Sequence, residues 1–230
     1  MVEAIKKAAL GTEQTIKAAA GVSQHICKDS KLEAKWSEFF VQVLIYTLIC
    51  SFTFFLLWPL AHIRFLKWKY SKTIISGKRM NFEAKVSELY VKWIIWILLG
   101  TITFGIHTLL FLPVRYQQWH TSKLTLEGET GVSQFTGGVI EFFFTRMAAW
   151  VVSIFFFPIG LGIRQSMLTN FIYANRTVSG KEFKLHATGM GFMGMWAFWA
   201  LLSVLSFGIW TFLALERAQW NFIVACTEIK

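Results

Sequence analysis

Residues Phe82 to Trp119 read FEAKVSELYVKWIIWILLGTITFGIHTLLFLPVRYQQW, and this stretch organises the chain. It opens with a short alternating segment, continues as a long apolar run, and breaks near its middle at Thr103–Gly105. The apolar run is followed by a more polar segment that contains Arg115 and Trp119. Such a unit is typical of a membrane-embedded repeat protein, and it contains no catalytic motif.

The composition favours lipid as part of the surroundings. Hydrophobic residues make up 55% of the 230 residues and charged residues 16%, against roughly 45–50% and ~25% in soluble domains. The net charge of +10 predicts a face held against anionic headgroups. We expect no nucleic-acid partner, because the basic residues flank apolar runs instead of forming one stripe.

The unit recurs along the chain. KLEAKWSEFF (31–40) matches NFEAKVSELY (81–90) closely, and QFTGGVIEFF (134–143) and KLHATGMGFM (184–193) match more loosely. A fixed period of about 50 residues indicates tandem repeats, with boundaries at about 31–80, 81–133, 134–183 and 184–230. Residues 1–30 are predicted to form an N-terminal amphipathic helix and a linker, and residues 31–230 a membrane-embedded domain.

Each apolar run is predicted to fold back as a short helical hairpin. A run is long enough for one crossing of ~20 residues, so four single membrane spans remain the alternative. The triplets TFF, TFG, FFP and SFG fall in the middle of the runs, which favours turns at Gly105, Pro158 and Gly208. Polar connectors such as TIISGKRMNFEAK (73–85) indicate strand–turn–strand. The predicted fold class is therefore a mainly α membrane protein of four hairpin repeats, with a small sheet on one membrane face.

A family resemblance rests on several of these motifs. They are TFGIH (103–107), SFGIW (206–210), GKEFKLHATG (180–189), and the exits around Arg115–Trp119 and Arg217–Trp220. Together they resemble the YjgN-like family of bacterial inner-membrane proteins, over about Leu32 to Lys230. The function of that family is not established. The resemblance implies a place in the bacterial inner membrane, with the basic connectors facing the cytoplasm, but no activity.

Candidate functional residues are few. His107, Lys92 and Arg146 are candidate intramembrane ionisable residues within the apolar runs, and such residues suggest an ion or proton site. For Lys92 and Arg146 we favour the simpler interpretation that the side chains snorkel to the membrane interface. The remaining candidates are lipid-interface anchors: Arg64, Trp68, Arg115, Trp119, Arg217 and Trp220.

The sequence predicts a non-enzymatic protein. No nucleophile–base set, phosphate loop or metal-ligand spacing is evident, and Cys27, Cys50 and Cys226 form neither a disulfide framework nor a metal set. We expect no cofactor. The favoured function is a membrane-embedded scaffold or assembly subunit that self-associates as a homo-oligomer or binds a membrane-complex partner. The alternative is a channel or small-solute transporter with its pathway between the hairpins.

Overall fold

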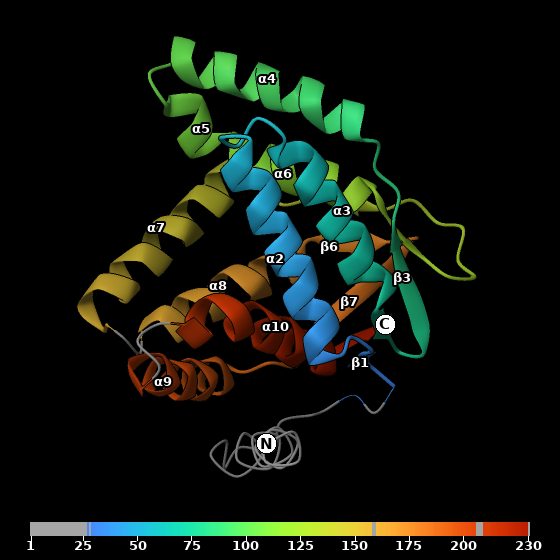
Figure 1. Ribbon diagram of the computed structural model, residues 1–230, viewed down its shortest axis with the longest axis vertical. Helices are drawn as coiled ribbons and strands as arrows, with labels where there is room; N and C mark the ends of the chain where they lie inside the picture. The colour runs from blue at the N-terminus through green and yellow to red at the C-terminus, as the bar shows by residue number, and fades with distance from the viewer. Residues whose placement is uncertain (1–26, 28, 158–159, 206–208, 230) are drawn as a thin grey trace.

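The chain folds as two halves of the same design, seen in a computed structural model that describes residue 27 and residues 29–157, 160–205 and 209–229 (Figure 1). The first half contains β1 (Lys31–Leu32), α2 (Trp36–Phe52), α3 (Trp58–Ser71), β2 (Thr73–Ile75), β3 (Lys78–Phe82), α4 (Val86–Ile102), α5 (Ile106–Leu110), α6 (Leu112–Ser122) and β4 (Leu124–Leu126). The second half contains β5 (Gln134–Phe135), α7 (Val139–Phe155), α8 (Gly160–Ala174), β6 (Arg176–Val178), β7 (Lys181–Leu185), α9 (Gly189–Leu205), α10 (Ile209–Ala225) and β8 (Thr227–Ile229).

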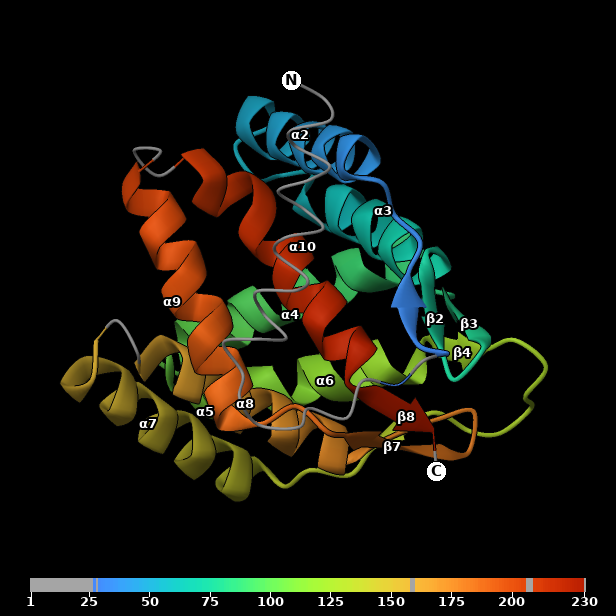
Figure 2. The same ribbon diagram turned by 90° about the horizontal axis from the view of Figure 1, so that it is seen from below.

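The strands pair in the same register in both halves. In the first sheet, ordered β1-β2-β3-β4, Lys31 lies opposite Ile74. In the second sheet, ordered β5-β6-β7-β8, Gln134 lies opposite Thr177. Both residue numbers are 103 higher than those of the pair in the first sheet. The other six residue pairs of the first sheet recur at the same interval. The strands gather on one side of the molecule, and the helix pairs extend away from them (Figure 2).

Two serines join the sheets to each other. The Ser76 hydroxyl, just after β2, accepts a hydrogen bond from the Ile229 amide of β8 at 3.0 Å. The Ser179 hydroxyl, just after β6, accepts one from the Leu126 amide of β4 at the same distance. Each half therefore supplies a hydroxyl to the last strand of the other half, and the two sheets form one unit.

The long apolar runs divide at threonines that link two helices. The Thr103 hydroxyl donates to the Leu99 carbonyl at the end of α4 (2.6 Å) and accepts from the His107 amide at the start of α5 (3.0 Å). Thr53 makes the same two bonds between α2 and α3. Helix ends leave backbone N–H and C=O groups without partners. Each threonine hydroxyl bonds to a carbonyl at the end of one helix and to an amide at the start of the next. Gly105 completes the second turn with a φ of 86°, which costs glycine little.

One hydrophobic core is shared by the two halves. Side chains of β2, β4 and β6 alternate between buried and half-buried positions, as expected for strands with one packed face. Ile75, Leu124 and Val178 are fully buried there, together with Tyr70 and Trp119 from the bases of the helices. Burial of each such aliphatic side chain contributes roughly 1.5–3 kcal/mol. The sheets and helix bases therefore hold the fold together.

The predicted fold class, a mainly helical membrane protein of four tandem repeats, is wrong. Among the helices of the described residues, none is both long enough and apolar enough to cross a membrane. The longest of them have 17 residues, because the apolar runs are divided at the turns. The strands form two four-stranded sheets instead of the single small sheet of the prediction. The predicted transmembrane and integral-membrane character is corrected with the fold class.

Some predicted features lie outside the described residues. The N-terminal amphipathic helix falls on residues 1–26, and two of the turn residues are Pro158 and Gly208. The division of the chain into residues 1–30 and 31–230 stays a prediction.

Candidate functional site

The turns between paired helices expose large apolar side chains. Phe54, between α2 and α3, is 92% exposed, and Phe104, between α4 and α5, is 97% exposed. Phe155, at the end of α7, is 78% exposed. Phe54 and Phe104 also have positive φ angles of 46° and 50°, a conformation that costs a side chain with a Cβ roughly 1–2 kcal/mol. Packing within the chain therefore gives no reason for phenylalanine at these two turns.

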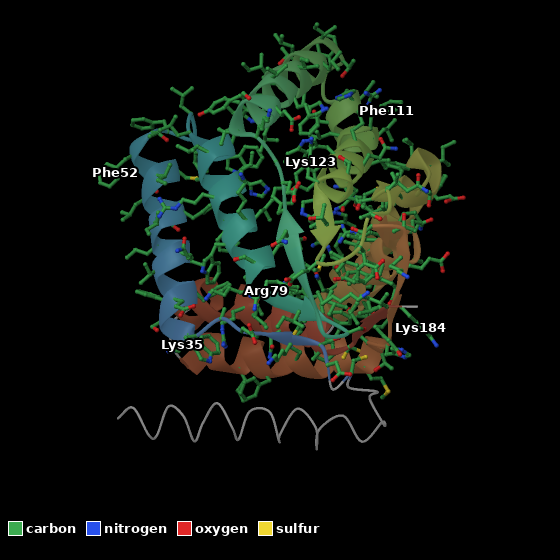
Figure 3. The ribbon with its side chains drawn as sticks, turned by 90° about the vertical axis from the view of Figure 1, so that its right-hand side faces the viewer. Lys35, Phe52, Arg79, Phe111, Lys123 and Lys184 are labelled. Carbon is green, nitrogen blue, oxygen red and sulfur yellow. The ribbon has the colours of Figure 1, made fainter. Side chains whose placement is uncertain are left out.

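We call the exposed apolar residues at these turns the hairpin tips. Their members are Phe52, Phe54, Phe55, Leu56, Ile102, Phe104, Ile106, Ile154, Phe155, Phe156 and Phe157. Figure 3 shows Phe52 pointing outwards at the far end of α2 from Lys35. Monomeric proteins in water rarely expose apolar patches larger than a few hundred Å² unless the patch contacts lipid or another molecule. The hairpin tips are therefore a candidate contact surface.

The predicted basic anchors differ in their surroundings. Arg64 and Arg115 are exposed. Arg217 is half-buried, donates to the Ala34 carbonyl at 2.6 Å, and stacks on the Trp36 ring at 4.1 Å. Burial lowers the pKa of the Arg217 guanidinium from its ordinary value. Arg217 thus fastens α10 to the start of the first helix pair.

The predicted tryptophan anchors take part in packing. Trp68 lies against the Phe39 ring, with the ring centroids 5.7 Å apart. Trp119 is buried in the shared core. Trp220 donates its Nε1–H to the Thr73 hydroxyl at 3.0 Å and carries the Lys69 ammonium 4.3 Å above its ring. Trp119 and Trp220 therefore stabilise the region where the two halves meet.

Two of the predicted polar candidates have opposite surroundings. His107 is only 8% exposed and stacks on the Phe111 ring in the turn region of α5. Neither of its ring nitrogens has a hydrogen-bond partner among the described residues. Lys92 is exposed on α4, and the Glu88 carboxylate one turn before it pairs with Lys123 at 2.9 Å. Of these two candidates, His107 is the buried one, and both of its ring nitrogens are unsatisfied among the described residues.

A cavity of about 810 Å³ lies between the first three helix pairs, which are α2–α3, α4 with α5–α6, and α7–α8. Its apolar wall includes Trp58, Trp93, Trp96 and Phe142. The polar side chains of the lining are Thr108, Tyr116, Gln117 and Arg146. Small-molecule sites are typically ~300–1,000 Å³ and combine apolar walls with a few polar groups. This cavity has the size and the lining of such a site.

Arg146, a predicted site residue, supplies the charge in this lining. Its guanidinium is half-buried on α7 and donates to the Leu109 carbonyl at 3.3 Å. Burial and then the neighbouring Arg164 lower the pKa of Arg146 from its ordinary value. Arg164 itself stacks on the Trp150 ring at 4.3 Å. Within the described part of the chain no carboxylate, Glu141 included, forms an ion pair with Arg146.

Two tyrosine–histidine pairs lie next to the cavity, and one of them contains the lining residue Tyr116. The Tyr116 hydroxyl is 2.7 Å from His62 Nε2, and the Tyr70 hydroxyl is 3.1 Å from His120 Nε2. The Tyr116 and His120 rings stack with centroids 5.7 Å apart. Burial lowers the pKa of His62 to about 4. Burial, aided by Arg176, also holds the pKa of His120 well below its ordinary value. Both imidazoles are therefore neutral at pH 7.

Arg176 brings a buried cation to the same region. This β6 residue is 7% exposed, and its guanidinium donates to Gln117 Oε1 at 2.8 Å. Its Nε has no hydrogen-bond partner among the described residues. The equivalent position of the first half is Thr73, which accepts a bond from Trp220. Sequence reasoning missed Arg176, although the Ser-Gly-Lys shared by residues 76–78 and 179–181 aligns this arginine with Thr73.

One group of potential metal ligands comes together near the ends of the described chain. A Cys27 sulfur, a His186 ring nitrogen and a Glu228 carboxylate oxygen lie within 4.8 Å of one another. The sequence predicted no metal set, because these residues are far apart along the chain. Burial, and then Glu228 and Asp29, raise the pKa of the Cys27 thiol. Metals bind the thiolate, so this environment disfavours the form that would bind.

Comparisons with known proteins reach the level of a family. The model of a family described as "Bacterial protein of unknown function (DUF898)" matches residues 29–230. No curated protein and no solved structure matches the chain. The family match covers every element described above and carries no activity with it.

Proposed function

This chain belongs to the DUF898 family of bacterial proteins of unknown function, the YjgN-like family that its motifs resemble, and we propose that it is a non-enzymatic scaffold held against a lipid bilayer by its hairpin tips. The observation that supports this function is the near-complete exposure of Phe54 and Phe104 in strained turns. In water nothing offsets the free-energy cost of the exposed rings and strained turns, whereas burial of the rings in lipid offsets it.

Insertion of the tips into one leaflet is energetically reasonable. Moving a phenylalanine from water into an apolar environment contributes roughly 1.5–3 kcal/mol, and several tips act together. Interfacial segments of proteins bury their apolar face ~5–10 Å deep, which short helix pairs reach without crossing. The bonds of Thr53 and Thr103 at the turns are made within the chain, so these backbone groups do not need water.

The net charge of the chain favours anionic lipid. The chain carries a net charge of +10, which favours approach to an anionic surface over a neutral one. We therefore place the protein at the bacterial inner membrane, with its basic connectors on the cytoplasmic side. The sheets lie on the side of the molecule away from the tips (Figure 2), which leaves them available to a partner protein or to a second copy of the chain.

Vesicle flotation tests the lipid contact. The double variant Phe54→Asn/Phe104→Asn removes two tip side chains and places asparagine, which tolerates positive φ, in the same turns. The matched control is Val132→Asn, which removes an exposed apolar side chain from the loop after β4. Wild type and the control should float with vesicles that contain phosphatidylglycerol, and the double variant should bind at least tenfold more weakly. Equal flotation of the double variant, or no flotation of the wild type, rejects the lipid contact.

A channel or small-solute transporter is the second candidate function. The observation that favours it is the cavity between the helix pairs, whose lining residue Thr108 follows the buried and unpaired His107 in α5. Reconstituted protein should then conduct protons or small ions, and His107→Ala should change that flux. If no flux is measured, the scaffold is favoured. If flux is unaffected by the substitution, His107 has no part in it.

A further inference from the structure

We infer that the cavity between the first three helix pairs binds an anionic amphiphile, with a carboxylate or phosphate head at Arg146 and a hydrocarbon chain among the tryptophans. Fatty acids and single-chain phospholipids share this chemistry. The inference does not depend on the proposed lipid contact, because a ligand in this cavity is bound by one molecule in solution without a bilayer.

The shape and wall of the cavity suit a hydrocarbon chain. Its volume of about 810 Å³ lies within the range of small-molecule sites. Trp58, Trp93 and Trp96 come from two neighbouring helices and form a wide aromatic wall. Each buried CH₂ group of a ligand favours binding through the hydrophobic effect, so a longer chain should bind more tightly until the cavity is full.

The charges around the cavity select an anionic head. Arg146 has no carboxylate partner among the described residues and makes a single long bond to a backbone carbonyl. A guanidinium carries five N–H donors, so it retains the capacity to hold a carboxylate or phosphate. Arg164 lies close enough to lower the pKa of Arg146. An anion bound at the Arg146 guanidinium would offset the positive charge there.

A second cation, next to the cavity lining, also favours a ligand with a negative charge. Arg176 is buried and donates to Gln117, which lines the cavity. Buried charges are normally paired, yet no ion pair of Arg176 occurs in the described residues. The nearby His62 and His120 are neutral at pH 7 and add no compensating charge. The cavity therefore favours an anion over a cation.

Fluorescence provides a direct test. The probe is cis-parinaric acid, a conjugated fatty acid that accepts excitation energy from tryptophan, used below the concentration at which it aggregates. Its methyl ester has the same chain without the charge, and lysophosphatidic acid carries a phosphate head as a competitor. The acid should bind at one molecule per chain and at least tenfold more tightly than the ester. Competition by lysophosphatidic acid decides whether phosphate or carboxylate is preferred.

The variants separate the roles of charge and space. Arg146→Gln should weaken acid binding about tenfold and leave the ester unchanged, while Arg146→Lys should retain part of the preference. Arg164→Gln is the matched control, because that side chain stacks on Trp150 and does not line the cavity. Its effect should stay below threefold. Leu168→Trp, which places a bulkier side chain in the lining, should weaken binding of both probes.

Several outcomes would overturn the inference. They are the absence of energy transfer to the acid, equal affinity for acid and ester, and acid binding that Arg146→Gln leaves unchanged. The Phe54→Asn/Phe104→Asn variant distinguishes this site from the hairpin tips. It should bind the acid like the wild type, whatever its behaviour on vesicles. Loss of acid binding in that variant would place the probe on the tips and reject the cavity.

Discussion

Ser76 and Ser179 occupy equivalent places in the two halves and make the same bonds in opposite directions. Both have a positive φ, 49° and 50°. Each amide donates to the hydroxyl of a second serine, Ser30 at 2.9 Å or Ser133 at 2.8 Å. Each hydroxyl accepts a strand amide from the opposite half at 3.0 Å. Four serines thus hold the two sheets together with an approximate twofold pattern.

Loss of either linking hydroxyl should destabilise the fold. Ser76→Ala and Ser179→Ala each leave a strand amide without its acceptor, which costs about 1–3 kcal/mol. Alanine and serine both carry a Cβ, so the positive φ costs the same in both. Urea unfolding measures the difference. Ser122→Ala is the control, because that hydroxyl donates only to the Trp119 carbonyl of its own helix. A control effect as large as that of the two linking serines would contradict their proposed role.

The threonine at the second turn should act as a cap for α5. Thr103→Val keeps the branched shape but removes the hydroxyl that serves both helices. Loss of such a cap costs about 0.5–2 kcal/mol. Thr101→Val is the matched control, since the Thr101 hydroxyl donates to the Ile97 carbonyl within α4. Thermal unfolding should separate the two variants, and equal melting temperatures would show that the cap contributes nothing.

Stability should fall as the pH drops below 6.5. The folded state holds the pKa of His62 at about 4 because of burial, whereas an unfolded histidine has a pKa of about 6.5. Well above pH 6.5 both states are neutral and there is no effect. Between pH 6.5 and 4 only the unfolded state gains the proton, so the free energy of unfolding decreases, by roughly 1 kcal/mol at pH 5.5.

His120 adds a contribution of the same sign, because its pKa is also lowered by burial. Urea unfolding at pH 7.5, 6.5 and 5.5 measures the slope while carboxylates remain ionised. His62→Gln should reduce the slope without removing it. A stability that is constant over this range would show that the two imidazoles are not buried as described.

The buried imidazole of His107 should reduce stability. Its ring nitrogens lack partners among the described residues, and an unsatisfied buried polar group costs about 1–3 kcal/mol. His107→Leu should therefore raise the free energy of unfolding. His120→Leu should lower it, because the Tyr70 hydroxyl loses its bond to that ring. Equal destabilisation by both substitutions would contradict the claim that the His107 ring is an unsatisfied buried group.

Local signals in the sequence correspond to one turn and one strand of the described residues. Gly105 lies in the left-handed turn, where the TFG triplet indicated a break. The alternating residues around Phe82 are a strand. Such features depend on a few neighbouring residues, because caps, positive φ and alternation are short-range properties.

The fold class could not be obtained in the same way. A run of apolar residues predicts burial but not what covers it, and the run around Trp96 consists of helices too short to cross a membrane. The contacts of Ser30 with Thr227 and of Arg176 with Gln117 join residues far apart in the chain. Only the register of the two sheets brings them together, and no local motif encodes that register.

Placement of the Phe104 side chain in lipid is the most direct test of the account. A Phe104→Cys substitution in a Cys27→Ser background allows an environment-sensitive fluorophore to be attached at the tip, since Cys50 and Cys226 are buried. On addition of phosphatidylglycerol vesicles the emission should shift to shorter wavelength and be quenched by lipids with a nitroxide on the acyl chain. A label at Val132→Cys should not respond. Emission at position 104 that stays at its value in water would contradict the account.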